Sequence, residues 1–203
     1  MNTRPIAAAI AVVAAVAALS ACSSSDDSTS GHEGHDMASM STSAANASAS
    51  DSAHNAADVM FAQMMLPHHE QALEMSDILL AKDGVPTDVR ALATSIKQAQ
   101  GPEITQLTSW LTAWGEPTTA DMSGHTMDGM VSADDIAKLK DASGPDAAKL
   151  YLTQMIAHHE GAVSMAQSQV TGGKNADAVA MARSIVESQT AEITTMKAML
   201  GTS

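Results

Sequence analysis

A segment of this sequence occurs twice. Residues 61–75 read FAQMMLPHHEQALEM, and residues 151–165 read YLTQMIAHHEGAVSM. The similarity continues downstream, where a second set of residues has counterparts in the same order: Ile96, Gln100, Glu103 and Leu111 correspond to Ile185, Gln189, Glu192 and Leu200. The repeated unit is therefore two segments long, and the fold must contain that unit twice.

Each segment of the unit has the periodicity of an α-helix. In the first segment, apolar residues recur at spacings of three and four, as at Phe61, Met65, Ala72 and Leu79. Glycine and proline interrupt the pattern within each unit, over residues 82–86 and 171–173. Each unit therefore predicts a helical hairpin. Two hairpins predict an all-α, ferritin-like four-helix bundle with a long crossover between them.

Three local features refine this prediction. We expect Thr87 to cap the second helix and a short helix to span Ser132–Lys140 in the crossover, with Asp135 in its first turn. Gly101 and Pro102 fall inside the second helix, where proline removes a backbone hydrogen bond and clashes with the preceding turn. Because the repeat keeps its register on both sides, we predict a kinked but continuous helix.

The first 21 residues are typical of an export signal. Arg4 precedes the apolar run 6–19, which is shorter than the roughly 20 residues needed to span a bilayer. The only cysteine, Cys22, follows Leu-Ser-Ala, which resembles the lipobox of bacterial lipoproteins, where the cysteine is lipidated. The alternative is an ordinary secretory signal with a chance cysteine. We predict an extracytoplasmic protein whose contact with the bacterial cell membrane is a lipid anchor at Cys22.

Residues 22–54 contain mostly Ser, Ala, Asp and Gly, with almost no large apolar side chains. Such a segment cannot bury enough surface to offset its ordering entropy, so it predicts a disordered tether. The bundle then occupies residues 55–203. We expect the first repeat at about 55–114, the crossover at 115–145 and the second repeat at about 146–203.

Composition narrows the chemistry. The chain has 15 Met and 8 His but only one Cys, so it is neither a disulfide scaffold nor a thiolate zinc module nor a cysteine enzyme. Its formal charge of −13 argues against a nucleic-acid partner and favours cations.

The two copies of the repeat retain methionine and histidine while their other core residues change. Phe61 becomes Tyr151 and Leu66 becomes Ile156, which are swaps that packing tolerates. At about 100° per residue, the retained side chains lie on the inward stripe of each first helix. We predict that they form a metal site: Met65, His68, His69, Met75, Met155, His158, His159 and Met165. Supporting residues are expected on the partner helices: Gln100, Glu103, Gln189 and Glu192.

Thioether and imidazole ligands without thiolate suit Cu(I), or Ag(I), better than Zn(II), Mg(II) or Ca(II). A di-iron bundle uses Glu-x-x-His, but Met65 and Met155 stand where those carboxylates would be. Glu70 and Glu160 are predicted on the outer side of their helices. A structural network is the alternative, in which His68 and His158 only form hydrogen bonds to the supporting residues named above.

Two further stretches combine methionine and histidine in segments without a core to fill. One lies in the tether and the other in the crossover, and both predict auxiliary soft-metal ligands: His32, His35, Met37 and Met40, and Met122, His125, Met127 and Met130. Random drift of a linker sequence is the alternative for the first stretch.

The doubled motif, Met-x-x-His-His with a methionine six residues later, resembles the DUF305 family over about residues 55–200. The resemblance implies a ferritin-like four-helix bundle, exported or lipid-anchored, in bacteria. Some members are similar to periplasmic copper-binding proteins that use Met and His, whereas most have no established activity. Gly101-Pro102 departs from the family pattern near Glu103.

Three functions follow, of which the first is favoured. In the first, the chain is a surface-anchored protein that captures Cu(I) or Ag(I) for buffering, delivery or resistance, and under this hypothesis it is not an enzyme. Alternatively, it is a structural or interaction module whose His-His pairs stabilise the bundle. A ferritin-like redox enzyme ranks last, because Glu103 and Glu192 supply too few inward carboxylates. Pairing of two chains as a homodimer remains open.

Overall fold

The computed structural model describes residues 53–120 and 127–201. The predicted export signal, Cys22 and nearly all of the predicted tether lie outside these ranges. So do six of the predicted auxiliary ligands: His32, His35, Met37, Met40, Met122 and His125.

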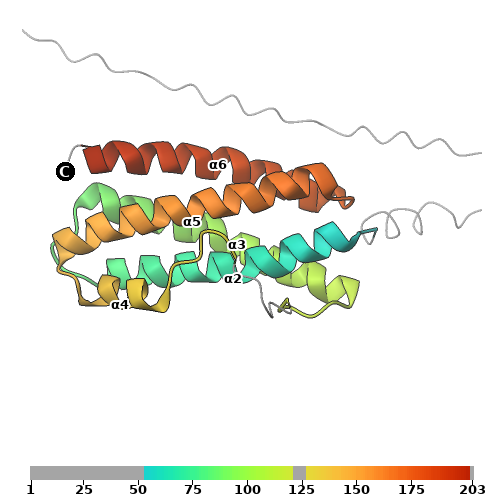
Figure 1. Cartoon of the computed structure of the whole chain (residues 1–203), viewed down its shortest axis with the longest axis horizontal. Helices are drawn as coiled ribbons and strands as arrows, with labels where there is room; N and C mark the ends of the chain where they lie inside the picture. Colours follow the sequence, from blue (N-terminus) through green and yellow to red (C-terminus); the bar gives the residue numbers. More distant parts are fainter. Residues whose placement is uncertain (1–52, 121–126, 202–203) are drawn as a thin grey trace, which may run out of the picture. The chain divides into compact units, whose positions relative to one another are not determined.

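The described residues form helices joined by turns, without strands (Figure 1). The helices are α2 (Ala56–Leu80), α3 (Thr87–Trp114), α4 (Ala133–Asp141), α5 (Gly144–Gly172) and α6 (Ala176–Gly201). α2 packs on α3, α5 packs on α6, and the two hairpins meet through α2 and α5. The all-α prediction is therefore confirmed. No helix in the described ranges is long and apolar enough to cross a membrane.

The start of α2 is fastened to the turn between α5 and α6. Asn55 and Asp58 form a reciprocal capping box, and the Asp58 carboxylate also accepts hydrogen bonds from Gln169, Lys174 and Asn175. Although burial raises the pKa of Asp58, these hydrogen bonds outweigh burial and hold it below its usual value. The two hairpins are thus joined at this end by an ionised, fully satisfied carboxylate.

The local predictions have mixed outcomes. α3 runs without a break through Gly101 and Pro102, as predicted, with Pro102 on the exposed side. The short crossover helix is confirmed with Asp135 in its first turn, although α4 begins after Ser132 and ends at Asp141; the Ser132 side chain accepts a hydrogen bond from the Asp135 amide. The prediction for Thr87 is wrong: Pro86 is the N-cap, no side chain caps the helix, and Thr87 is already its first residue.

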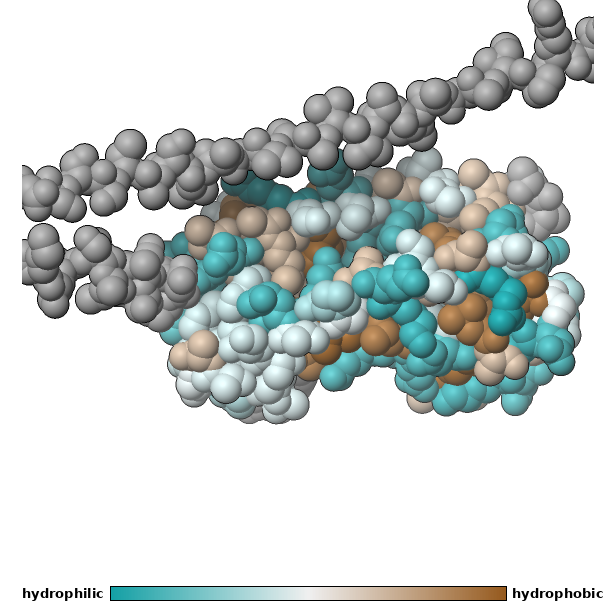
Figure 2. All heavy atoms as spheres, turned by 180° about the vertical axis from the view of Figure 1, so that it is seen from behind, coloured by the Kyte–Doolittle hydropathy of each residue, from teal (hydrophilic) through white to brown (hydrophobic). Residues whose placement is uncertain are grey.

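The core consists of two hydrophobic clusters, one towards each end of the α2/α5 interface. The α4-side cluster includes Met75, Tyr151 and Met155 together with Ile136 and Leu139 of α4. The far-side cluster contains no residue of α4. It includes aromatic residues of α2 and α3, and its members include Phe61, Met65, Leu107 and Trp110. On both α2 and α5 the His-His pairs fall between the residues of these clusters. Hydrophilic side chains cover most of the bundle face in Figure 2, with a few apolar patches between them.

Candidate metal centre

Two histidines face each other where α2 meets α5. The ring centroids of His68 and His158 are 3.6 Å apart, the rings are tilted by 37°, and neither side chain is exposed. We call these residues the inner pair. Because each belongs to a different repeat, the centre exists only when the two hairpins pack together.

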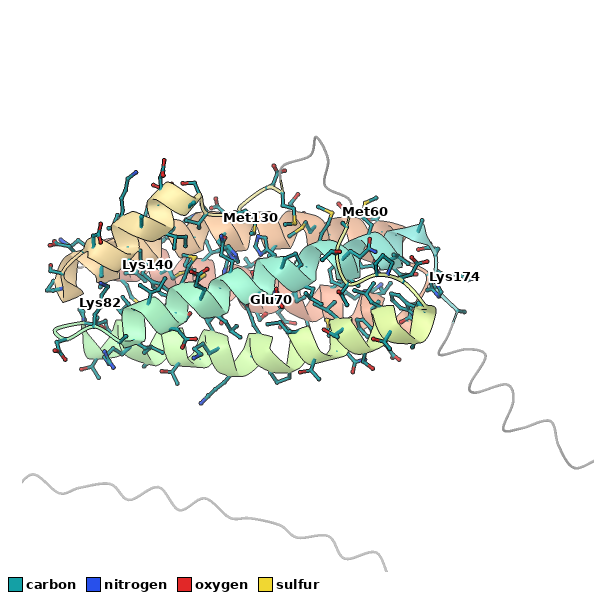
Figure 3. All side chains as sticks on the ribbon, turned by 90° about the horizontal axis from the view of Figure 1, so that it is seen from below. Met60, Glu70, Lys82, Met130, Lys140 and Lys174 are labelled. Atoms are coloured by element: carbon teal, nitrogen blue, oxygen red, sulfur yellow. The ribbon has the colours of Figure 1, made fainter. Side chains whose placement is uncertain are left out.

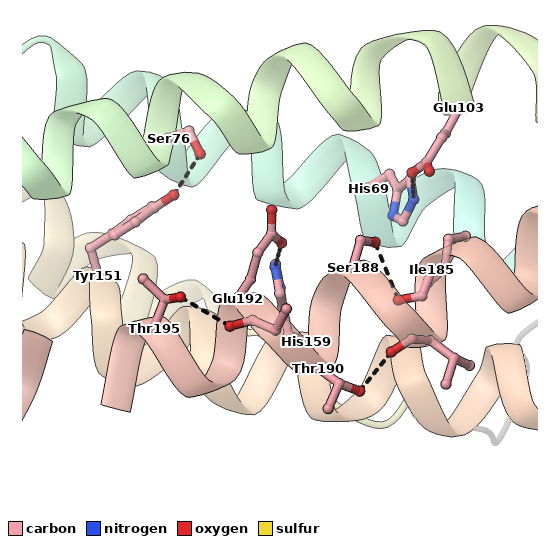
Figure 4. A network of polar contacts seen from close by, with 12 residues as sticks. His69, Ser76, Glu103, Tyr151, His159, Ile185, Ser188, Thr190, Glu192 and Thr195 are labelled. Atoms are coloured by element: carbon pink, nitrogen blue, oxygen red, sulfur yellow. Dashed lines mark hydrogen bonds and ion pairs between the residues drawn. The ribbon is translucent and has the colours of Figure 1, made fainter. Parts of the chain in front are cut away.

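The neighbouring histidines, the outer pair, turn towards the second helix of their own hairpin. His69 Nε2 lies 2.8 Å from a Glu103 carboxylate oxygen, and His159 Nε2 lies 2.7 Å from one of Glu192 (Figure 4). The carboxylate can only accept, so each Nε2 carries the proton, and in the neutral ring Nδ1 keeps its lone pair. A carboxylate that orients a histidine in this way is the usual arrangement behind a metal-ligating imidazole.

The hydrogen bonds differ from the structural network that the sequence suggested. In the expected network, His68 and His158 formed hydrogen bonds to residues of the partner helices. In the structure, the neighbouring His69 and His159 form hydrogen bonds to the partner helices instead. Gln100 and Gln189 are buried on the partner helices, as expected, but their side-chain oxygens accept no hydrogen bond.

Six buried ring nitrogens in the described residues make no hydrogen bond of standard geometry, although the Asp128 and His68 backbone carbonyls lie near the His68 and His158 rings. They are both nitrogens of His68, both of His158, and Nδ1 of His69 and His159. A buried polar group left in this way costs about 1–3 kcal/mol. A cluster of four such rings is therefore costly as a purely structural device, and its lone pairs suit a metal that binds nitrogen.

The environment keeps the inner pair neutral. Burial, helped by the charges that His69 and His159 would carry and partly opposed by the Asp128 carbonyl, lowers the pKa of His68 to about 3. Burial also holds the pKa of His158 well below its usual value, with a small opposing effect from the His68 carbonyl. Neutral imidazole is the form that coordinates metal ions.

The methionines of the repeat lie on both sides of the histidines. Met75 and Met155 belong to the α4-side cluster, while Met65 belongs to the far-side cluster and Met165 packs against it. The first three are fully buried, and Met165 is half-buried. The structure thus brings His68 and His158 into contact and flanks the two His-His pairs with thioethers.

The described side chains do not form a preformed metal-binding geometry. In residues 53–120 and 127–201, no three His, Cys, Asp or Glu side chains are arranged to hold an ion. Glu70 and Glu160 are exposed, as predicted, and Glu160 pairs with Lys197 at 3.0 Å. A metal ion at the centre would therefore need rearranged imidazoles, thioethers, or both.

A strap covers the inner pair. The crossover returns to the bundle through Met127–Val131, where Gly129 has a φ of +85°. A Cβ on Gly129 would lie 2.9 Å from the Gly161 Cα and from the His158 carbonyl oxygen, so the strap rests directly on α5. On α2, the Gln71 amide makes two hydrogen bonds to the Val131 backbone, at 2.9 and 2.8 Å.

Sequence reasoning missed these fastenings. Gln71 and Gly161 occupy the same position in the two repeats, directly after His-His-Glu. This difference between glutamine and glycine was the one signal in the repeat that α2 and α5 contact different neighbours at that position. The strap also holds two predicted auxiliary ligands, Met127 and Met130, and both are half-buried; Figure 3 shows Met130 beside α5.

Comparison with known proteins identifies the family of this chain. The family model for DUF305, a domain of unknown function, matches residues 58–200 of the sequence. The protein belongs to the DUF305 family. Similar structures include a DUF305 protein of Streptomyces coelicolor, at 35% identity over 71% of this chain and 92% of that one, with a TM-score of 0.68. A DUF305 fragment of Deinococcus radiodurans is 32% identical over 73% and 98% of the two chains, with a TM-score of 0.67.

A third similar structure is CopM in its Cu(I)-bound form. It is 30% identical over 71% of this chain and 96% of that one, with a TM-score of 0.60. CopM has also been solved in Ag-bound, Cu(II)-bound and apo forms. Among curated proteins, no match was found.

Proposed function

We propose that this DUF305 protein captures a soft monovalent metal ion, Cu(I) or Ag(I), at the four-histidine centre between its hairpins. The observation that carries the proposal is the group of six unpaired imidazole nitrogens at the α2/α5 interface. The bound ion would be cargo for buffering, delivery or resistance, and no catalytic step is part of the proposal.

Each group of residues has a distinct role in this proposal. His68 and His158 are the primary ligands, and His69 and His159 contribute through Nδ1 while Glu103 and Glu192 orient their rings. Methionine thioethers on either side add soft ligands: Met65, Met75, Met155 and Met165.

Relatives support the choice of metal. A family member that is 30% identical over most of this chain has been solved with Cu(I) and, in other crystals, with Ag and Cu(II). The absence of thiolates and the pairing of imidazole with thioether favour the monovalent ions on independent chemical grounds.

We also propose that capture occurs outside the cytoplasm, with Cys22 lipidated and residues 22–54 serving as a tether. The export-type N-terminus and the position of the only cysteine support this location. Histidines and methionines of the tether and the crossover would then act as outlying ligands.

The structural module is the second candidate. The hydrogen bonds of the outer pair to Glu103 and Glu192 favour it, because those bonds link α2 to α3 and α5 to α6 without any metal. It leaves the unpaired nitrogens of the inner pair without a role.

A Cu(I) competition titration against a coloured chelator separates the two candidates. The double variant His68→Leu/His158→Leu should lose at least about 100-fold in affinity, equivalent to about 2.7 kcal/mol. The control His54→Gln changes a histidine that stacks on Trp114, away from the centre, and should bind like the parent. Unchanged affinity and stoichiometry in the double variant would leave the structural module as the better account.

A further inference from the structure

The face where α2 meets α5 is covered unequally along its length. At one end α4 lies over it, and Ile136 and Leu139 of α4 pack into the same cluster as Met75. The strap crosses the middle, above the inner pair. Beyond the strap, no helix of the described ranges lies over this face, and Figure 3 places Met60 on that side of Met130.

A row of soft ligands on α2 leads from that end of the face to the inner pair. Met60, Met64 and His68 follow one another at intervals of four residues, so they are neighbours along one side of the helix. Met60 is 59% exposed, Met64 is half-buried and His68 is fully buried. Met60 is also the one large apolar side chain with such exposure in the described ranges.

The facing helix contributes a third thioether at the same end. Met165 lies two turns beyond His158 on α5 and packs against the far-side cluster that contains Ala62 and Met65 of α2. It is half-buried, whereas Met75, its counterpart in the first repeat, is fully buried under the α4 end. The repeat thus leaves one of two equivalent methionines partly accessible, and it is the one at the end of the α2/α5 interface that carries Met60 and Met64.

We propose that Met60 and Met64, together with Met165, form an entry site through which a soft monovalent cation reaches His68 and His158. Thioethers suit this task because they bind Cu(I) and Ag(I) in preference to hard cations and sit on flexible side chains. The exposed Met60 takes the ion from outside, and Met64 and Met165 pass it to the buried imidazoles. This inference rests on the proposed function of the centre and adds the direction from which it is filled.

The test is the rate of metal exchange measured beside the equilibrium affinity. Transfer of Cu(I) from a coloured chelator complex to the whole protein is followed by stopped-flow absorbance, and release is followed by adding excess chelator. In Met60→Leu/Met64→Leu, both rates should fall by about tenfold, as for about 1.4 kcal/mol added to the barrier, with affinity unchanged. The matched control Met181→Leu removes a half-buried thioether from α6 and should keep the parental rates.

The outcomes separate the entry site from the centre that it serves. Parental exchange rates in Met60→Leu/Met64→Leu, with binding that still depends on the inner pair, would overturn the entry site and leave the centre standing. Loss of one bound ion without slower exchange would show an independent surface site and would also overturn it. Absence of Cu(I) binding by the parent protein would overturn both.

A second measurement does not depend on the folding of that variant. In His68→Leu/His158→Leu, substoichiometric Ag(I) should still shift the methyl ¹³C resonances of Met60 and Met64, because the entry site is intact. Unshifted resonances at both methionines would count against the entry site.

Discussion

The inner and outer histidine pairs come from the same His-His dipeptides but meet different surroundings. His69 and His159 each bond a carboxylate that is 21% exposed. His68 and His158 form no hydrogen bond to a side chain. Their ring centroids are 3.6 Å apart, and the strap covers them. Successive residues of a helix point about 100° apart, so one histidine faces the other hairpin and the next faces its own partner helix. One dipeptide therefore supplies both an unpaired ligand and an oriented one.

The largest expected difference is in metal-dependent stability. The parent protein should gain about 4 kcal/mol of unfolding free energy when free Cu(I) is about 1,000 times its dissociation constant, and His68→Leu/His158→Leu should gain almost none. Without metal, the variant should be as stable as the parent or more so, because apolar side chains replace unpaired polar ones. Urea unfolding with and without Cu(I) measures both. A large loss of stability without metal would mean that the inner pair is structural.

Changing the partners of the outer pair should have a smaller effect. Glu103→Gln/Glu192→Gln should weaken Cu(I) affinity by about 10- to 100-fold, the usual cost of removing a carboxylate behind a ligating histidine. It should also lower unfolding free energy by about 1 kcal/mol per bond. Competition titration and urea unfolding provide the two readings. The control Glu160→Gln, which breaks an exposed pair with Lys197, should leave affinity unchanged; a loss of affinity there would point to a general effect of charge.

Displacing the strap should change the burial of the inner pair but not that of the outer pair. A methyl group at Gly161 would overlap the Asp128 and Gly129 backbone, so Gly161→Ala should displace the strap and cost about 1–3 kcal/mol, offset in part by helix propensity. The pKa of His68 should rise towards its ordinary value as burial decreases. Gly101→Ala is the control: it meets open space on α3 and should stabilise by up to about 1 kcal/mol. Urea unfolding and NMR titration of His68 measure these effects, and a His68 titration unchanged in Gly161→Ala would separate the strap from the centre.

A further expected difference is in the pH dependence of the metal-free protein. Because the pKa of His68 is about 3 in the folded state and about 6.5 when unfolded, the unfolded chain binds more protons between these values. The resulting stability is complete above about pH 6.5 and is lost as the pH falls, at up to about 1.4 kcal/mol per pH unit. Because the pKa of His158 is also well below its usual value, the difference between the parent and His68→Leu/His158→Leu, measured by urea unfolding from pH 7 to pH 5, gives the combined slope of the two histidines. Parallel pH profiles would contradict it.

Much of the fold followed from local signals in the sequence. The repeat and its glycine and proline breaks predicted the helices, and the unbroken register predicted that α3 continues through Pro102. The retained His-His pairs indicated the centre. Their hydrogen bonds were assigned to the wrong histidine, because that choice depends on how each helix is rotated against two neighbours.

The strap could not be predicted from local signals. Its contacts join Gly129 to Gly161 and Val131 to Gln71, residues that are far apart in the chain. Helical periodicity places Met165 and Met75 equivalently, yet α4 and the strap leave one half-buried and the other fully buried. The strap contacts and the unequal burial of the two methionines both depend on where the crossover packs against the folded bundle.

The central claim is that the unpaired imidazole nitrogens bind a soft metal ion, and histidine ¹⁵N NMR with Ag(I) tests it most directly. On addition of one equivalent, the ring nitrogens of His68 and His158 should shift strongly and show coupling to silver. Nε2 of His69 and His159 should remain protonated and bonded to Glu103 and Glu192. If Ag(I) binds while all four rings keep their metal-free resonances, the ion is held elsewhere and the account of the centre is wrong.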